Sequence, residues 1–165
     1  MQLRKLELRD AELMLEWMHD ESVVKDLKAD FSGKTIEDCY AFINGALTST
    51  EDLHLAIADN NGEYMGTVSL KHIHDKSAEF GITVRKSAMG KGYSRYGMDE
   101  ILRKGFEELD LDFVYWCVDP VNKRAVRFYD KNGFLRSKCP SVVQGYLKEE
   151  IERYIWYSIK RGDWK

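Results

Sequence analysis

Residues 119–134 read DPVNKRAVRFYDKNGF, and this stretch decides how the chain is organised. Asn122 ends a turn, and the spacing of the apolar residues after it predicts a helix from Asn122 to Asn132. Gly133 comes where a left-handed residue closes a helix. Tyr129 follows Asn122 by two helical turns and lies on nearly the same face. The stretch therefore predicts a turn, a helix and a glycine cap, with Asn122 and Tyr129 on one side.

The residues before this stretch predict a strand-helix-strand crossover. FVYWCV at 113–118 is a continuous apolar run with the length of a strand buried on both faces. Residues 78–84 alternate apolar side chains with others, as a strand does. Between them, residues 93–109 have helical spacing. We expect the two strands to be parallel and the crossover right-handed. The predicted buried stripe of the helix is Met98, Ile101, Leu102, Gly105, Phe106 and Leu109.

The turn that opens this helix, MGKGYS at 89–94, carries two glycines. Unpaired amides and the helix dipole make a helix N-terminus a site for a phosphate, and small residues let it approach. The alternative is an ordinary tight turn, in which the glycines serve only to give the backbone the φ angles that the turn needs. A dinucleotide fold is excluded because the third glycine of its G-x-G-x-x-G pattern is Arg95 here and several strands precede the turn. The P-loop pattern is absent.

The rest of the chain predicts an α+β fold (mixed α/β) in one domain, residues 1–165. We expect a mostly antiparallel sheet of six or seven strands with a parallel strand-helix-strand core and helices on both faces. Asn60-Asn61-Gly62 predicts a hairpin turn. Asp10 is expected to cap a first helix, and Thr35 with Asp38 to form a capping box. The further strands are expected at 2–8, 54–58, 64–72, 134–143 and 151–160, and a short helix is expected around Val23, Val24 and Leu27.

The two motifs together resemble the GCN5-related N-acetyltransferase (GNAT) superfamily. Its second pattern, N-x-x-A-x-x-x-Y-x-x-x-G-F, is filled by Asn122, Ala125, Tyr129, Gly133 and Phe134. In the first pattern, Arg/Gln-x-x-Gly-x-Gly/Ala, Gly92 falls on the first glycine. Met89 replaces the usual Arg or Gln, and Ser94 replaces the second small residue. The resemblance covers essentially the whole chain and implies a GNAT-like fold with acetyl-CoA as acyl donor.

The resemblance also implies roles for named residues. Asn122 would hydrogen-bond the pantetheine, or only cap its helix. Tyr129 would protonate the leaving thiolate, since a phenol keeps its proton at neutral pH, or would only pack as a core aromatic. Backbone groups of Ile82, Thr83 and Val84 would pair with the pantetheine arm. The pyrophosphate would be surrounded by Met89, Gly90, Lys91, Gly92, Tyr93, Ser94 and Arg95.

A general base or a chain of water molecules must take a proton from the attacking amine, because the amine must be neutral. Glu79 is the first candidate, since strand alternation points it away from the apolar side chains of residues 78–84. A solvent-facing glutamate explains the position equally. His72 and His74 have a suitable pKa, but isolated histidines are more often surface residues. No metal is expected.

Composition and charge narrow the remaining possibilities. The net charge is -3 without a basic stripe, so nucleic acid is not an expected partner. No apolar run is long enough for a membrane helix and no signal core is present, so we expect a cytoplasmic protein, either monomer or homodimer. The three cysteines are widely spaced, so neither disulfides nor a zinc site is expected. Cys117 is expected to be a core residue.

The acceptor is not fixed by any motif. The opening region resembles a subgroup that includes ribosomal-protein N-terminal acetyltransferases, and aminoglycoside, spermidine and amino-sugar acetyltransferases have similar openings. An amino-sugar or other small primary amine is our first expectation, a protein N-terminus the second, with direct attack in a ternary complex. A catalytically silent acetyl-CoA sensor and a structural protein that uses only the anion site are the alternatives. Four aromatic residues are candidates for the lining of the acceptor pocket and equally for the core: Trp17, Phe31, Tyr146 and Trp156.

Overall fold

The structure is a computed structural model of residues 1–165, and one sheet of seven strands runs through it. The strands are β1 (Gln2–Lys5), β2 (Leu53–Ala58), β3 (Tyr64–His74), β4 (Ser77–Val84), β5 (Phe113–Val118), β6 (Arg136–Ser137) and β7 (Ile155–Lys160). Their order across the sheet is β1-β2-β3-β4-β5-β7-β6. β4 and β5 are parallel, and every other neighbouring pair is antiparallel.

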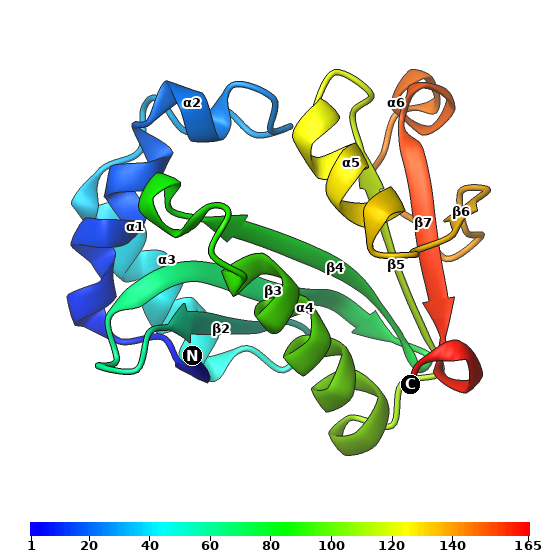
Figure 1. The fold of residues 1–165 in the computed structure, drawn as a ribbon, viewed down its shortest axis with the longest axis horizontal. Helices are drawn as coiled ribbons and strands as arrows, with labels where there is room; N and C mark the ends of the chain where they lie inside the picture. The colour runs from blue at the N-terminus through cyan, green and yellow to red at the C-terminus, as the bar shows by residue number, and fades with distance from the viewer.

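Helices cover both faces of this sheet (Figure 1). They are α1 (Ala11–Met18), α2 (Glu21–Val24), α3 (Ile36–Thr48), α4 (Tyr93–Arg103), α5 (Lys123–Lys131) and α6 (Lys148–Arg153). α1 and α3 bury side chains such as Met14 and Ile43 against one face. α4 and α5 bury Met98, Ile101 and Tyr129 against the other, in the larger core. The expected fold class is confirmed.

β4 and β5 separate after a short parallel pairing. They pair only at Ser77 with Phe113, Ala78 with Val114, and Glu79 with Tyr115. β4 continues to Val84 with β3 as its one neighbour. Figure 1 shows the two strands converging near the C-terminus of the chain and diverging toward the end where α5 lies. One edge of β4 is therefore unpaired over its last residues, on the side that faces α5.

The local signals in the sequence form as predicted. Thr35 and Asp38 make a capping box at the start of α3. Gly62 takes a φ of +83° in the β2–β3 turn. Asn122 caps α5 with its side chain, and Gly133 follows that helix with a φ of +81°. These features depend on a few adjacent residues, so the sequence alone carries them.

Asp10 is a correction to the prediction, because its side chain does not cap α1. Both carboxylate oxygens accept hydrogen bonds from the Arg4 guanidinium, at 2.8 and 2.7 Å, and one also accepts from the Glu7 amide at 2.8 Å. Asp10 is buried. A buried carboxylate needs a cationic partner more than the helix needs a cap, so the ion pair determines its orientation.

The predicted ends of three elements are wrong. The first strand stops at Lys5. The strand expected at 134–143 is reduced to β6, because the chain turns away after Ser137 and Pro140 has no N–H with which to continue the pairing. The strand expected from residue 151 begins at Ile155, since KEEIER at 148–153 forms α6 from good helix formers.

The helix expected at 93–109 changes its winding near the end. α4 stops at Arg103, and a single π-type turn spans Lys104–Glu108. The wider turn carries extra residues and rotates the next part of the chain away from the buried stripe. Leu109 is therefore 42% exposed, contrary to the prediction.

Candidate active site

The glycine turn before α4 leaves its backbone donors free. Gly90 and Gly92 take φ angles of +73° and +88°, which glycine adopts without strain. Gly92 is the N-cap of α4. No oxygen of the protein accepts a hydrogen bond from the amides of residues 90–95. Consecutive free amides at the positive end of a helix could hold an anion such as a diphosphate.

A cavity of about 250 Å³ opens beside this turn, between β4 and α5. Lys91 and Tyr93 belong to the turn but do not line the cavity, and Glu79 lies outside it. The structure brings together most of the residues that the sequence singles out as donor-binding: Ile82, Thr83, Val84, Met89, Gly90, Gly92, Ser94, Arg95, Asn122 and Tyr129.

Arg124 also lines this cavity, and the sequence analysis missed it. Its guanidinium donates to the Met89 sulfur at 3.1 Å and makes no ion pair, so its charge is not neutralised by a carboxylate. Arg95, by contrast, is paired with Asp99 at 2.9 Å. The signal that could have found Arg124 is a basic residue in the first turn of α5, two residues after Asn122.

Asn122 both caps α5 and lines the cavity. Its Oδ1 accepts a hydrogen bond from the Ala125 amide at 3.2 Å, which is the N-cap interaction. The side-chain amide N–H groups donate no hydrogen bond to the protein. Because the cap occupies only the oxygen, the amide nitrogen is available to a molecule in the cavity.

Tyr129 packs among aromatic rings and still reaches the cavity. It is 6% exposed, and the ring centroids of Trp116 and Tyr157 lie 5.3 and 5.2 Å from its own. Its hydroxyl makes no hydrogen bond, yet it is not among the fully buried unpaired atoms, so the hydroxyl opens into the cavity. Burial raises the pKa of Tyr129, which keeps the phenol protonated. The residue is a core aromatic and a possible proton donor at once.

Glu79 lies on the opposite face of the sheet from Tyr129 and is only 6% exposed, so it is not a solvent-facing glutamate. Its Oε1 accepts a hydrogen bond from the Tyr146 hydroxyl at 2.7 Å and lies 3.6 Å from the Lys71 ammonium. Its Oε2 lies 3.8 Å from Nε2 of His72. Glu79 is therefore a buried carboxylate with charged and polar partners on both oxygens.

Cys117 extends this cluster as a neutral thiol. Its Sγ–H donates to the Tyr146 hydroxyl at 3.5 Å, and burial raises the pKa of Cys117 to about 11. The thiolate form is scarce at neutral pH, which argues against a nucleophilic cysteine. Trp156 packs edge-on against Tyr146, with ring centroids 5.4 Å apart.

A second cavity, of about 300 Å³, lies on the same face of the sheet as Glu79. Trp17 and Phe31, two of the aromatic residues expected at the acceptor site, line it, with ring centroids 5.1 Å apart. Ile82 and Thr83 of β4 line both this cavity and the one beside the glycine turn. The two cavities therefore share a wall at the stretch of β4 that has parted from β5.

His54 and Ser69 line the second cavity, and the sequence analysis missed both as site residues. They face each other across β2 and β3, and Ser69 in turn faces Gly81 of β4. The histidines named from sequence lie elsewhere: His72 reaches Glu79 from the bulged end of β3, and His74 is 81% exposed beside Asp75. Only the strand register distinguishes His54 from these residues.

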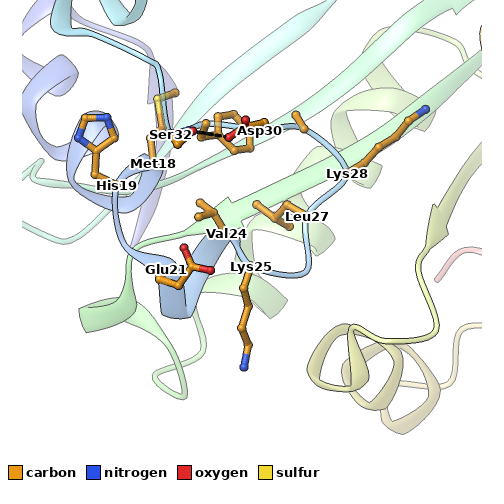
Figure 2. Close-up of a pocket in the computed structure, with 11 residues that line it drawn as sticks. Met18, His19, Glu21, Val24, Lys25, Leu27, Lys28, Asp30 and Ser32 are labelled. Atoms are coloured by element: carbon orange, nitrogen blue, oxygen red, sulfur yellow. Dashed lines mark hydrogen bonds between the residues drawn. The ribbon is translucent and has the colours of Figure 1, made fainter.

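A third hollow, of about 480 Å³, is formed by the end of α1, by α2 and by the loop after it (Figure 2). Its lining residues, from Met18 to Ser32, come from no strand and include none of the predicted site residues except Phe31. Figure 2 shows Lys28 extending away from it. The Lys28 ammonium lies 3.8 Å from the ring centroid of Tyr146 and 3.2 Å from Oε2 of Glu150. This loop thus contacts the segment that carries Tyr146.

Two further findings concern the chain as a whole. None of the helices is both long and apolar enough to pass through a bilayer. No three His, Cys, Asp or Glu side chains are grouped so that they could hold a metal ion.

Comparison with known proteins places the chain in one family. Residues 1–135 match the acetyltransferase (GNAT) domain family. A relative named uncharacterized N-acetyltransferase p20, from Bacillus licheniformis, is 25% identical over 96% of this chain and 92% of its own length. A spermidine N(1)-acetyltransferase from Vibrio cholerae serotype O1 is 30% identical over 70% of this chain and 62% of its own length.

The fold is shared with solved structures. The crystal structure of a spermidine N-acetyltransferase from Vibrio cholerae, in complex with CoA and spermine, superposes with a TM-score of 0.81. It is 21% identical, and the match covers 99% of this chain and 96% of that one. The chain belongs to the GNAT acetyltransferase family, which confirms the predicted enzyme class, an acyltransferase that uses acetyl-CoA.

Proposed function

We propose that this protein transfers the acetyl group of acetyl-CoA to a small primary amine by direct attack in a ternary complex. The observation that carries the proposal is that two cavities on opposite faces of the sheet are both lined by Ile82 and Thr83. One offers the donor-binding features, and the other is lined by aromatic and polar side chains. An amine and a thioester that enter from opposite faces would come together there, as direct transfer requires.

The donor cavity suits CoA in charge and shape. The free amides of residues 90–95 and the unpaired charge of Arg124 would hold the diphosphate. The pantetheine arm would lie along the open edge of β4 at Ile82, Thr83 and Val84, where the backbone has no neighbour on the β5 side. The free amide N–H groups of Asn122 would donate to it. The side chains around the turn, Met89, Lys91, Tyr93, Ser94 and Arg95, would border the diphosphate.

Tyr129 would protonate the leaving CoA thiolate. Burial raises its pKa, so the proton is present at any physiological pH. The hydroxyl has no competing partner in the protein. The aromatic packing around the ring fixes its direction, which general acid catalysis needs.

Glu79 would attract the acceptor ammonium through its negative charge and is one candidate for the group that takes its proton. It is a buried carboxylate on the acceptor face, with Tyr146 fixing one oxygen.

The family match ends at residue 135, but the site as we propose it also uses residues beyond that point, namely Tyr146, and Trp156 of β7. We therefore propose that residues 1–165 form one catalytic domain.

An amino-sugar or other small primary amine is the acceptor class that we propose first, and a protein N-terminus second. The second cavity is about 300 Å³, which suits a small molecule. The relative from Vibrio cholerae is named for a polyamine, spermidine, which is also a small primary amine.

A thiol-release screen tests the proposal. Acetyl-CoA is the donor, and the acceptors offered are amino-sugars, polyamines, aminoglycosides and peptides with free N-termini. We expect release with at least one small amine. Binding of acetyl-CoA in a calorimeter without thiol release from any of them would instead support a catalytically silent sensor.

A further inference from the structure

Three side chains outside the residues already assigned form a line on the acceptor face, joined by one hydrogen bond and one ion-pair contact. The Ser69 hydroxyl lies 2.6 Å from Nδ1 of His54. Nε2 of His54 lies 3.6 Å from Oδ2 of Asp52. The other oxygen of Asp52 accepts a hydrogen bond from the His72 amide at 2.8 Å, which fixes the direction of the carboxylate. The order Ser69, His54, Asp52 is that of a hydroxyl, a base and the group that orients the base.

The strand register places this line at the bottom of the acceptor cavity. His54 of β2 faces Ser69 of β3, and Ser69 faces Gly81 of β4. Gly81 has no side chain, and the flexible end of the Lys71 side chain lies over that position, with its Cε 3.4 Å and its Nζ 3.6 Å from where a Cβ would be. His54, Ser69 and Gly81 all line the cavity, and Gly81 is next to Ile82, which lines both cavities. An amine seated over Gly81 would contact the Ser69 hydroxyl.

We propose that Ser69, His54 and Asp52 form a proton relay that deprotonates the acceptor amine. An N–H proton of the bound ammonium passes to Oγ of Ser69 while the hydroxyl proton of Ser69 passes to Nδ1 of His54. The freed nitrogen lone pair attacks the acetyl carbon. His54 then carries a positive charge, which the Asp52 carboxylate stabilises, and it later loses its Nε2 proton to solvent. Ser69 ends as it began, and exchange of the ring protons of His54 with water restores the tautomer whose Nδ1 is free. The second N–H proton of the amine is released when the tetrahedral intermediate collapses, and it replaces the proton that Tyr129 gives to the CoA sulfur.

The surroundings keep His54 neutral and ready to accept a proton. Burial lowers the pKa of His54; Asp52 raises it and Lys71 lowers it, both by smaller amounts. From α3, the ring of Phe42 packs against the imidazole with centroids 4.8 Å apart. The other charged side chains that line the cavity are Lys34 and Asp38, both exposed. Asp52 is one-third exposed, which gives the proton an exit to solvent.

The relay rests on the proposed function but is separable from the role of Glu79. Glu79 does not line the acceptor cavity, and Tyr146 and Lys71 already engage its Oε1. His54 and Ser69 line the cavity itself, and Asp52 lies behind His54 and is one-third exposed. Substitutions can therefore address the two proton acceptors one at a time.

The test compares His54→Gln, Ser69→Ala and Asp52→Asn with His74→Gln as the matched control. His74 is also paired with an aspartate, Asp75, at 3.0 Å, but both are exposed and away from the cavities. Thiol release is measured with glucosamine and with spermidine from about pH 5 to about pH 9, the span in which histidines titrate. Calorimetric binding of acetyl-CoA and thermal melting show that each variant is folded.

We expect kcat of the wild type to fall as pH drops through a step below the ordinary histidine pKa of about 6.5, because the relay needs neutral His54. His54→Gln and Ser69→Ala should lose at least about tenfold in kcat and lose the step, with acetyl-CoA affinity unchanged. Asp52→Asn should move the step to lower pH, since Asp52 raises the pKa of His54. His74→Gln should match the wild type.

Two results would go against the relay. If His54→Gln keeps the wild-type kcat and pH profile, the relay is wrong while the acetyltransferase proposal stands. If Glu79→Gln abolishes the step and His54→Gln does not, the proton goes to Glu79. If the wild type itself releases no thiol with any amine, the proposed function is wrong, and the relay proposal is wrong with it.

Discussion

The Tyr146 hydroxyl donates a 2.7 Å hydrogen bond to Oε1 of Glu79, across a sequence separation of 67 residues. Tyr146 comes from the irregular segment between β6 and α6, and Glu79 from the last paired position of β4 beside β5. The Cys117 thiol and the Lys28 ammonium complete the surroundings of the Tyr146 side chain. The C-terminal part of the chain thus determines how the buried carboxylate of the central sheet is directed.

Tyr146→Phe should lower kcat while acetyl-CoA binding stays unchanged. The ring and its packing remain, but Glu79 loses the hydroxyl that fixes one oxygen. A hydrogen bond to a charged group contributes about 1.5–3 kcal/mol, so we expect a loss of about tenfold or more in kcat. Tyr154→Phe is the matched control, because Tyr154 packs against Tyr146 and its hydroxyl faces Glu150 at 3.4 Å, not Glu79. Equal turnover in both variants would show that Glu79 needs no orientation by Tyr146.

Tyr129→Phe should lower kcat by about a hundredfold or more, the contribution of a positioned general acid. The dissociation constant of acetyl-CoA should stay the same, because the ring still lines the cavity. The burial that raises the pKa of Tyr129 keeps the acid protonated as pH rises. The alkaline side of the wild-type pH profile should therefore show no loss from this group below its ordinary pKa of about 10.

Tyr157→Phe controls for the loss of a buried hydroxyl. Tyr157 packs against Tyr129 with ring centroids 5.2 Å apart, but its hydroxyl donates to Asp130 at 2.9 Å and lies outside the cavity lining. That variant is expected to lose stability without the selective loss of kcat. A Tyr129→Phe enzyme with wild-type kcat would remove Tyr129 as the acid.

The sequence predicts the donor cavity better than the acceptor side because the donor motifs are local. The cap at Asn122 and the left-handed Gly92 and Gly133 each depend on a few neighbouring residues. Helix caps and left-handed glycines can therefore be predicted without knowing where the other strands lie. The family resemblance adds Tyr129, which helical spacing alone would leave as a core aromatic.

The acceptor side depends on contacts between distant segments, which spacing cannot supply. His54 differs from His72 and His74 only through the β2–β3–β4 register, which places it opposite Ser69 and in line with Gly81. Strand alternation gives the face on which Glu79 lies, but not its burial or its bond to Tyr146. The bond depends on Tyr146, which lies between the two strands predicted at 134–143 and 151–160, where the sequence predicts no regular structure.

Gly92→Ala should weaken acetyl-CoA binding by about tenfold. At a φ of +88° an alanine is strained by about 1–2 kcal/mol, so the turn should relax away from the geometry that presents its free amides. Gly133→Ala is the matched control, because Gly133 has a φ of +81° with open space around it and follows α5 at its far end. Both variants should lose similar stability in thermal melts, while only Gly92→Ala loses affinity in calorimetry. Equal affinity in the two would mean that the turn does not hold the donor.

Gly66→Ala should displace the part of β4 that lines both cavities. A Cβ at Gly66 would come within 2.5 Å of the Thr83 carbonyl oxygen and 2.9 Å of Cα of Val84. Backbone atoms cannot rotate away, so β4 must shift, at a cost of about 1–3 kcal/mol in the free energy of unfolding. Gly45→Ala is the control, because Gly45 lies on the exposed side of α3 and a Cβ there would have no atom within 4 Å. This variant should be neutral or slightly stabilising.

Because Thr83 lines both cavities, Gly66→Ala should also raise the KM for acetyl-CoA and the KM for the amine together. Steady-state kinetics with each substrate varied in turn measures the two effects. A variant that loses stability but keeps both KM values would show that the position of Thr83 matters only for the sheet, and that substrates do not meet at this part of β4.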